Sequence, residues 1–345
     1  MLAPDYLQRQ DRLCRKISAA KIDAVVLGGS AGADANAFYY CGDAAFPSFI
    51  IASAGAAVAY SSQEKDFFPD GIRVEPLSAF GTDLRRLLAD KTVKAVGVDR
   101  RAASAPGLLF ELSRKRKKPV DFTKHLLNLR LVKDAYEIAC IQRAQKTTLE
   151  CLEEVSRRVR CGRVAGESEN YLAGICEMRA RELGASLDAF PPIVQSGART
   201  SVFHDATSNK PVGQEELLLV DIGARYRGYC GDATRTFYDG SDKKITDAVE
   251  AVQEAKAAGI KKAKVGAKGR AIADAALKVL REYGFEKFSF RKTGLSIGHF
   301  VGLEVHDGPS LEKTTLKRGM AFTVEPGVYV PGKFGVRFED VVVLK

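Results

Sequence analysis

The stretch LLLVDIGARYRGYCGDATRTFYDG, residues 217–240, carries two aspartates in a sequence typical of a buried β-hairpin. Its apolar and β-branched residues favour strands. A two-residue turn at Tyr226-Arg227 would place Asp221 directly opposite Asp232, with Cβ atoms about 5 Å apart. Two buried carboxylates this close repel each other, so the pattern predicts a positive group between them or a proton on one of them.

A second predicted hairpin, TVEPGVYVPGKFGVRFEDVVV, follows at residues 323–343 and carries two glutamates. Glu325 and Glu339 lie symmetrically about Gly332, in a Pro-Gly sequence that favours a turn. An odd-length loop centred on this glycine puts both carboxylates on one face. The sequence therefore predicts two hairpins that each present a pair of carboxylates.

The segment SIGHFVGLEVHDGP, residues 296–309, adds imidazole groups from His299 and His306. Four carboxylates and one neutral imidazole suit two divalent cations, and Mn²⁺, Co²⁺, Fe²⁺ and Zn²⁺ all accept such oxygen-rich ligands. On spacing alone the alternatives stay open. Aspartates beside hairpins often only form turns, and a single histidine is often only hydrogen-bonded within the fold.

The composition is that of an ordinary globular protein long enough for two domains. Of 345 residues, 28% are charged and 46% hydrophobic. No apolar run approaches the roughly 18 residues of a membrane span, and the polar N-terminal sequence lacks the apolar core of a signal peptide. We therefore expect a cytoplasmic protein. Seven cysteines without a CxxC pair indicate reduced thiols and argue against a thiolate zinc site.

The first part of the chain alternates short apolar segments with helical ones, which predicts an α/β domain over residues 1–122. The loop sequence LGGSAGADA, residues 27–35, follows a strand but has no phosphate-binding glycine pattern. The predicted strands are residues 23–27, 48–53, 56–60 and 94–98, and the predicted helices between them include residues 82–90 and 107–115.

Net charge is +10, and basic residues concentrate in SRKRKKP, residues 113–119. This run indicates either a nucleic-acid contact or, as we expect, a solvated surface or linker segment. We expect no specific nucleic acid and no membrane among the partners. The run and Pro119 are predicted to mark the end of the first domain.

Residues 123–345 are predicted to form an α+β domain with coarse internal symmetry. Two long helices precede each acidic hairpin, because apolar residues recur there at helical spacing. The four predicted helices are residues 134–160, 166–183, 243–262 and 269–283, and PPIVQSG, residues 191–197, reads as a strand.

Four segments together resemble one known family. VDIGARYRGYCGDATRTF, GHFVGLEVHDGP, GMAFTVEPGVYV and GVRFEDVV occur in order across residues 131–343. They resemble the pita-bread family that contains prolidase, aminopeptidase P, methionine aminopeptidase and creatinase. FYYCGDAAFPSFIIA, residues 38–52, is similar to the creatinase-type domain that precedes the catalytic domain in prolidase-like members.

The resemblance implies a site for two metal ions. The family's five ligand positions match Asp221, Asp232, His299, Glu325 and Glu339, the residues that spacing had already selected. In the family, the positions of Asp232 and Glu339 bridge both ions.

The resemblance also implies three further functional residues. His204 and His306 match histidines that contact substrate and stabilise the reacting amide, and Arg337 matches an arginine near the substrate proline. Glu325 is expected to shuttle a proton to the leaving nitrogen.

The predicted function is metal-dependent hydrolysis of the bond before proline, as in a Xaa-Pro dipeptidase. The absence of the longer N-terminal region common in aminopeptidase P leans towards a dipeptidase. An aminopeptidase acting on longer Xaa-Pro peptides and a non-catalytic binding protein on the same fold are the alternatives. Family resemblance further implies a homodimer.

Overall fold

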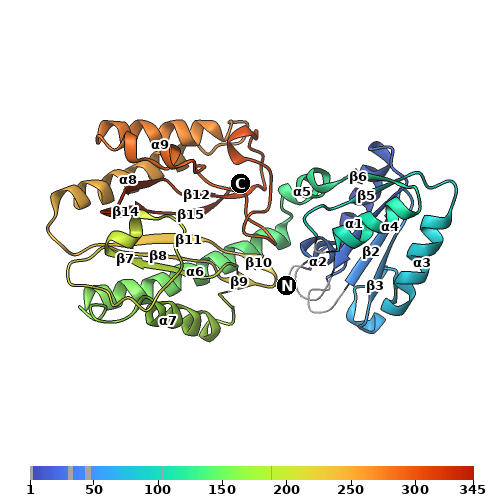
Figure 1. The fold of residues 1–345 in the computed structure, drawn as a ribbon, viewed down its shortest axis with the longest axis horizontal. Helices are drawn as coiled ribbons and strands as arrows, with labels where there is room; N and C mark the ends of the chain where they lie inside the picture. The colour runs from blue at the N-terminus through green and yellow to red at the C-terminus, as the bar shows by residue number, and fades with distance from the viewer. Residues whose placement is uncertain (1–2, 30–33, 43–47, 103, 188) are drawn as a thin grey trace. The chain divides into compact units, whose positions relative to one another are not determined.

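The computed structural model describes residues 3–29, 34–42, 48–102, 104–187 and 189–345, and it forms two compact units, Met1–Arg130 and Leu131–Lys345 (Figure 1). The predicted fold class, an α/β unit followed by an α+β unit, is confirmed. The division falls eight residues later than the predicted boundary after residue 122. The reason is that residues 123–130 are anchored in the first unit, where Nη1 of buried Arg130 donates to Oδ1 of Asn36 at 2.8 Å.

The first unit is built on one six-stranded mixed sheet in the order β4-β3-β2-β1-β5-β6. The four predicted strands are confirmed, whereas β4 and β6 are short, are not buried, and give little periodic signal. The strands are β1 Ala24–Gly29, β2 Ser48–Ser53, β3 Ala57–Ser61, β4 Val74–Pro76, β5 Ala95–Val98 and β6 Lys118–Asp121.

Among the residues that the structure describes, five α-helices complete the first unit (Figure 1). The two predicted ones are confirmed as α3 and α4. In the predicted loop of residues 27–35, Leu27–Gly29 finish β1 and Ala35 begins α2, and residues 30–33 lie outside the described residues. The helices are α1 Tyr6–Ala19, α2 Ala35–Cys41, α3 Leu77–Ala89, α4 Ala105–Arg114 and α5 Thr123–Leu131.

The basic run of residues 113–119 belongs to the first unit. Helix α4 ends at Arg114, and the chain then returns as β6, an edge strand that pairs in parallel with β5. Lys118 and Pro119 are exposed on that edge. Lysine and proline on an edge strand discourage pairing with another sheet. The segment lies on the surface, as expected, but it is part of the sheet edge and not a linker.

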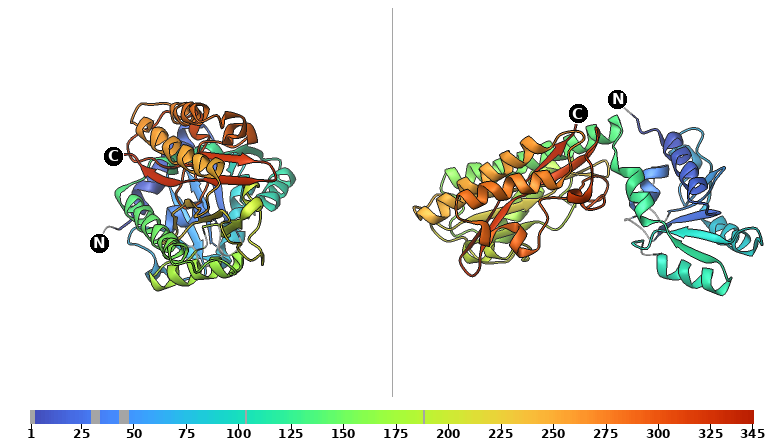
Figure 2. Two further views of the ribbon diagram at one scale, coloured as in Figure 1. Left: turned by 90° about the vertical axis from the view of Figure 1, so that its left-hand side faces the viewer. Right: turned by 90° about the horizontal axis from the view of Figure 1, so that it is seen from above.

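The second unit arranges two helix pairs on the outside of a set of short strands (Figures 1 and 2). All four predicted helices and the predicted strand of residues 191–197 are confirmed within a few residues. The elements are α6 Ala135–Arg160, α7 Glu169–Glu182, β7 Ile193–Ser196, β8 Leu218–Ile222, β9 Arg225–Tyr226, β10 Tyr229–Cys230, β11 Ala233–Phe237, α8 Lys243–Lys262, α9 Arg270–Glu282, β12 Ala321–Val324, β13 Gly327–Val330, β14 Phe334–Arg337 and β15 Asp340–Val343.

The hairpin of residues 218–237, here called the aspartate hairpin, has a different register from the predicted one. Asp221 pairs with Thr234 and not with Asp232. The turn residues are Arg227 and Gly228, with φ of 49° and 84°, because a two-residue hairpin turn of this type needs positive φ at both positions. The register moves by two residues, and side chains alternate with period two, so both aspartates still share one face.

The hairpin of residues 321–343, here called the glutamate hairpin, has the predicted register. Val330 pairs with Phe334 beside the turn, and Val324 pairs with Asp340 further along. Its centre is Gly332, which has φ of 65°. The same register places Glu325 opposite Glu339 across the hairpin, as predicted.

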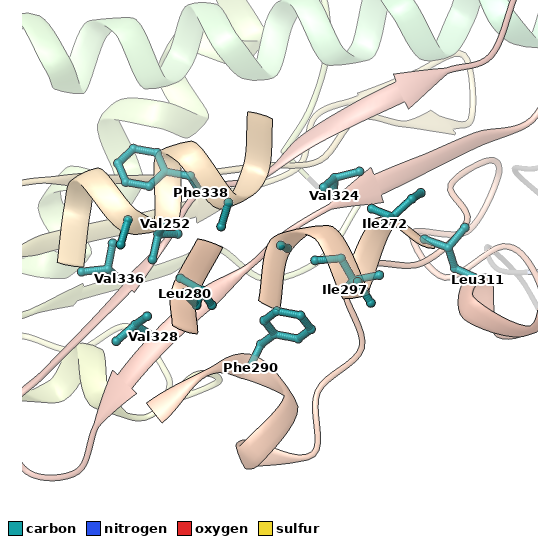
Figure 3. Packing of buried hydrophobic residues seen from close by; sticks show 14 of the residues in the cluster. Val252, Ile272, Leu280, Phe290, Ile297, Leu311, Val324, Val328, Val336 and Phe338 are labelled. Atoms are coloured by element: carbon teal, nitrogen blue, oxygen red, sulfur yellow. The ribbon is translucent and has the colours of Figure 1, made fainter. Parts of the chain in front are cut away.

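Two hydrophobic clusters enclose these hairpins. On β14 and the residue after it, alternate side chains enter the core that α8 and α9 cover, namely Phe334, Val336 and Phe338. Figure 3 shows Val336 and Phe338 in this core. Residues between them, including Arg337 and Glu339, face the opposite way. The aspartate hairpin packs likewise against α6 and α7 through Leu218, Val220, Ile222 and Ala233. Each large apolar side chain buried in this way contributes roughly 1.5–3 kcal/mol, which offsets the burial of carboxylates on the other face.

Among the described residues, no helix combines the length and apolar character that crossing a membrane requires.

Candidate metal centre

Three of the five predicted metal ligands converge on the imidazole of a fourth, His299. Its Nε2 lies 3.5 Å from Oδ2 of Asp232, 3.5 Å from Oε1 of Glu325 and 3.9 Å from Oε1 of Glu339. Ligand atoms of Asp232, His299 and Glu339 all lie within 4.8 Å of one another. Residues from both hairpins and from the segment between α9 and β12 thus present their donor atoms to one small volume.

Asp221, the fifth predicted ligand, reaches the cluster through an ion pair. Its Oδ2 accepts from Nη2 of Arg337 at 2.6 Å. Its Oδ1 is buried and has no hydrogen-bond partner among the described residues. A buried carboxylate oxygen without a partner is costly, and a bound cation would satisfy it. Asp221 also lies close enough to Asp232 and Glu339 to raise the pKa of both carboxyls.

The orientation of His299 is fixed by its own loop. Nδ1 lies 2.9 Å from the carbonyl oxygen of Val305. A carbonyl can only accept, so Nδ1 carries the hydrogen and Nε2 offers its lone pair to the carboxylate cluster. Burial, with a further contribution from His306, lowers the pKa of His299 to about 3, which keeps the ring neutral and ready to bind a cation.

The carboxyl groups are arranged so that they do not all ionise in the metal-free protein. Burial, followed by the charge of Glu339, raises the pKa of Asp232 well above its ordinary value. Burial and then Glu325 raise the pKa of Glu339 in the same way. Burial raises the pKa of Glu325 to about 7. Protons therefore occupy part of the site when cations do not.

Access to the cluster is uneven. The side chains of His299 and Glu325 are each 21% exposed, whereas those of Asp232 and Glu339 are only 4% and 3% exposed. Solvent therefore reaches the cluster from the side of His299 and Glu325.

Three residues that sequence reasoning missed hold the ligands in place. Thr234 Oγ1 donates to Oε2 of Glu339 at 2.8 Å, Thr323 Oγ1 donates to Oε1 of Glu325 at 3.4 Å, and Gln145 Oε1 accepts from the backbone N–H of Asp232 at 2.9 Å. Each threonine stands two residues from a ligand, so the strand period could have identified it. Gln145 comes from α6, and no local pattern connects it with the hairpin.

The two other histidines predicted to act at the site, His204 and His306, border the cluster. The ring of His306 contacts the ring of His299 edge-on, with centroids 4.1 Å apart. The ring of His204 lies 4.5 Å from that of Phe203, whose carbonyl accepts from Nη1 of Arg337. Burial lowers the pKa of both histidines, and for His204 the nearby Arg337 charge lowers it further. Both rings are therefore kept neutral.

Arg337 lies within the protein, with its side chain 2% exposed. Nε donates to Oγ1 of Thr234 at 3.1 Å, Nη1 to the Tyr329 hydroxyl at 3.0 Å, and Nη2 to Asp221. All three guanidinium nitrogens thus have partners inside the unit. The predicted alternatives were a positive group between the aspartates or a proton on one of them. Arg337 places a positive group beside Asp221, while the raised pKa of Asp232 favours a proton on that carboxyl.

The segment of residues 299–307, which carries His299 and His306, is held by a buried ion pair. Lys133 Nζ lies 3.4 Å from Oδ2 of Asp307, and the two side chains are 0% and 2% exposed. A Cβ added to Gly302 would lie 1.9 Å from that carboxylate oxygen, so only glycine fits there. Arg225 Nη1 fixes the same segment by donating to the carbonyl of Leu303 at 2.8 Å.

Two acidic hairpins backed by two helix pairs define the class of pita-bread metal-dependent hydrolases. Residues 139–345 match the model of Metallopeptidase family M24. Because the match covers more than half of the chain, the chain belongs to this family. It is 33% identical over 225 residues to a Xaa-Pro dipeptidase of Pyrococcus furiosus, an alignment covering 63% of this chain and 61% of that protein. The match therefore spans less than two thirds of that relative's own length.

Two solved structures share the whole two-unit fold. The X-Pro aminopeptidase from Thermotoga maritima has 29% identity and a TM-score of 0.81, with 97% of this chain and 94% of that chain covered. The prolidase from Pyrococcus furiosus has 26% identity and a TM-score of 0.84, with 96% of each chain covered. The predicted pita-bread fold and its creatinase-like N-terminal unit are thereby confirmed.

Membership of this family implies a divalent metal, and the residues present fit one. The donor set combines carboxylates, one of them with an unpartnered buried oxygen, and an imidazole whose Nε2 faces them. Hard, oxygen-rich ligands with a single nitrogen are characteristic of divalent first-row ions in hydrolytic sites.

Proposed function

We propose that this protein hydrolyses the peptide bond preceding proline, as a Xaa-Pro dipeptidase. The observation that carries the proposal is the convergence of Asp232, Glu325 and Glu339 on Nε2 of His299, in a chain of the M24 family. The names of its relatives support the substrate class, since they include a Xaa-Pro dipeptidase and an X-Pro aminopeptidase.

The proposed cofactor is a pair of divalent cations, Mn²⁺, Co²⁺, Fe²⁺ or Zn²⁺. Their ligands would be Asp221, Asp232, His299, Glu325 and Glu339, with Asp232 and Glu339 shared between the two ions. When bound, such ions act as Lewis acids and bring the pKa of water towards neutrality, which makes a nucleophile available at physiological pH.

The chain's own residues would then move protons and stabilise charge. Glu325, at the exposed side of the cluster, would accept a proton and pass it to the leaving proline nitrogen. His306 and His204, neutral because burial lowers their pKa, would each donate a hydrogen bond to charge that develops on the reacting amide. Removing one such donor typically lowers kcat by about 10²–10³-fold.

For Arg337 we propose action through Asp221. A guanidinium 2% exposed, with its nitrogens occupied inside the unit, is suited to holding that carboxylate in one orientation. The predicted contact with the proline end of the substrate would then pass through the segment of Phe203 and His204, which Arg337 also holds.

The test is hydrolysis by purified protein loaded separately with Mn²⁺, Co²⁺ and Zn²⁺. We expect cleavage of Ala-Pro and Met-Pro, and at least about 100-fold lower kcat/KM for Ala-Ala and Met-Ala, or about 2.7 kcal/mol of transition-state discrimination. A proline nitrogen carries no hydrogen and its ring fixes φ, so a pocket shaped for it discriminates against flexible residues. Equal rates on Met-Pro and Met-Ala would contradict the proposal.

An aminopeptidase acting on longer Xaa-Pro peptides is the second candidate, because one of the two-unit structural matches is an X-Pro aminopeptidase. Comparing Ala-Pro with Ala-Pro-Ala decides between the two, since a dipeptidase prefers the former. The proposal also retains the predicted homodimer and cytoplasmic location. Light scattering and cell fractionation test these.

A further inference from the structure

A single buried carboxylate holds both ends of the segment that carries His204. Glu169 is the first residue of α7, and it is 0% exposed. Its Oε1 accepts from the backbone N–H of Ser196 at 2.8 Å and from the Ser196 hydroxyl at 3.0 Å. Its Oε2 accepts from the backbone N–H of Ser208 at 3.1 Å and from the Ser208 hydroxyl at 2.6 Å.

These two serines bracket the segment of residues 196–208. Ser196 is the last residue of β7, and His204 lies between it and Ser208. The contact is reciprocal, because the backbone N–H of Asn170, in the first turn of α7, donates to the carbonyl of Ser208 at 2.9 Å. The start of α7 and the segment thus exchange hydrogen bonds in both directions.

Other contacts give the segment one compact conformation. Gln195 Nε2 donates to the carbonyls of Val202 at 2.9 Å and Asp205 at 3.2 Å. Arg199 lies 3.3 Å from Oε1 of Glu169 and 2.9 Å from Asp205. The residues on either side of His204 are therefore held by two side chains: Gln195, near the end of β7, and Arg199, which also contacts Glu169.

Burying a carboxylate to hold a loop has a large free-energy cost, so we looked for a role of Glu169 other than stabilising the fold. Desolvating the charge costs several kcal/mol, which four hydrogen bonds and Arg199 offset. The carboxylate fixes the positions of Ser196 and Ser208 relative to α7, because each of its two oxygens accepts from two donors on one serine. The N-terminus of α7 also favours a negative charge at this position.

We propose that Glu169 is a positioning residue for His204, setting the distance of its ring from the metal centre. The inference rests on the proposed function, in which His204 donates to the reacting amide. A glutamine at this position has nearly the same size but only one accepting oxygen. Its NH₂ group would face N–H and O–H donors at one of the two serines, so that end of the segment would be released.

The first measurement is hydrogen exchange of the metal-loaded Glu169→Gln variant. We expect faster exchange confined to the peptide covering residues 196–208, with metal content unchanged. Glu137→Gln is the matched control, because Glu137 is likewise a buried carboxylate in the first turn of a helix and accepts from a backbone N–H, that of Asp134 at 3.0 Å, yet it belongs to α6 and not to the segment. Unchanged exchange in residues 196–208 would overturn the proposal.

The second measurement is a double-mutant cycle on Xaa-Pro hydrolysis. Glu169→Gln alone should lower kcat/KM by about 10–100-fold, since a misplacement of about 1 Å costs up to 10²-fold. In a His204→Ala background the same change should cost less than about 3-fold, while in a His306→Ala background it should retain its full effect. Equal costs in both backgrounds would mean that Glu169 only stabilises the fold.

Two further arms keep the outcome decisive. If Glu169→Gln does not fold, Ser208→Ala removes the hydroxyl contact of 2.6 Å to Glu169, together with the 3.1 Å contact that this hydroxyl accepts from the backbone N–H of Lys210. The same exchange pattern and coupling to His204 are expected. If the wild-type protein cleaves no Xaa-Pro substrate, the proposed function fails. The exchange measurement then decides alone whether Glu169 holds the segment.

Discussion

The aspartate hairpin and the glutamate hairpin place their carboxylates on one face by different geometry. The first turns through two residues with positive φ, and its Asp221 lies opposite Thr234. The second turns through a loop centred on Gly332, and the strand pair Val324–Asp340 leaves its two glutamates adjacent across the hairpin. The aspartates are therefore offset along the strands, while the glutamates are not.

Each hairpin supports the other's carboxylate. Arg337 of the glutamate hairpin donates to Asp221, and Thr234 of the aspartate hairpin donates to Glu339, at 2.6 and 2.8 Å. Arg337 Nε also donates to Thr234, which joins the two contacts. The comparison shows that the two hairpins depend on each other, because Asp221 and Glu339 each have a hydrogen-bond partner on the opposite hairpin.

The largest expected effect is loss of Asp232, which we propose to be shared between two metal ions. We expect Asp232→Asn to abolish hydrolysis with little loss of fold, because an amide offers one neutral oxygen where two anionic ones are needed. Metal analysis should show fewer ions per chain than in the wild type. A variant that keeps both its metal content and its turnover would show that Asp232 does not bridge.

Removing the link between the hairpins should have the next largest effect. Arg337→Met leaves Asp221 buried and unpaired, so we expect the metal-free protein to lose about 3 kcal/mol of unfolding free energy in urea titrations. Adding Asp221→Asn to that variant should restore part of the loss, because the amide carries no charge. If the double variant is no more stable than Arg337→Met, the ion pair is not what connects the hairpins.

The glutamate hairpin should also make stability depend on pH. The folded pKa of Glu325, about 7, lies above the ordinary 4.5, and the pKa of Glu339 and Asp232 shifts in the same direction. A raised folded pKa means that the folded state binds the proton more tightly. This contribution is complete below about pH 4.5 and is lost as the pH rises through 7.

The melting temperature of chelator-treated protein should therefore fall by several degrees between about pH 5 and 7.5. Glu325→Gln is the matched control and should show a shallower fall, because one titrating group is gone. Bound metal should also reduce the slope, since cations replace the protons. Identical slopes in wild type and Glu325→Gln would contradict the assignment.

The smallest expected effects come from substitutions in the two turns, which should change the free energy of unfolding in opposite directions. Arg227→Asn should stabilise by about 0.5 kcal/mol, because asparagine accepts a left-handed conformation better than arginine. Gly332→Ala should destabilise by about 1 kcal/mol through backbone strain alone, since an added Cβ meets nothing within 4 Å. Gly55→Ala, at an equally open position without positive φ, is the control. Denaturant midpoints measure all three.

Local periodicity was sufficient to predict much of this molecule. Alternation with period two put Asp221 and Asp232 on one face even though the predicted turn was one residue early, because a register shift of two preserves the face. The symmetry of Glu325 and Glu339 about Gly332 gave the second register directly. These features depend on residues close together along the chain.

The support around the ligands could not be predicted in the same way. Gln145 reaches Asp232 from α6, and Glu169 reaches the His204 segment from the start of α7. Their positions depend on how helices pack on strands, and a helix pattern shows only which face is apolar. The compact units divide eight residues after the predicted boundary for a related reason, since Arg130 is anchored by a residue 94 positions away.

The buried pair of Lys133 and Asp307 bears on how the catalytic unit could be produced as a recombinant fragment. Residues that match the family begin at 139, which invites a truncation there. Such a fragment would lack Lys133 and would lose its buried ion pair with Asp307, the neighbour of His306. It would also lack the backbone N–H of Lys133, which donates to the carbonyl of Gly319 at 2.9 Å. An expression fragment that begins before Leu131 retains both contacts, so the useful start of the enzyme lies upstream of its recognisable sequence signature.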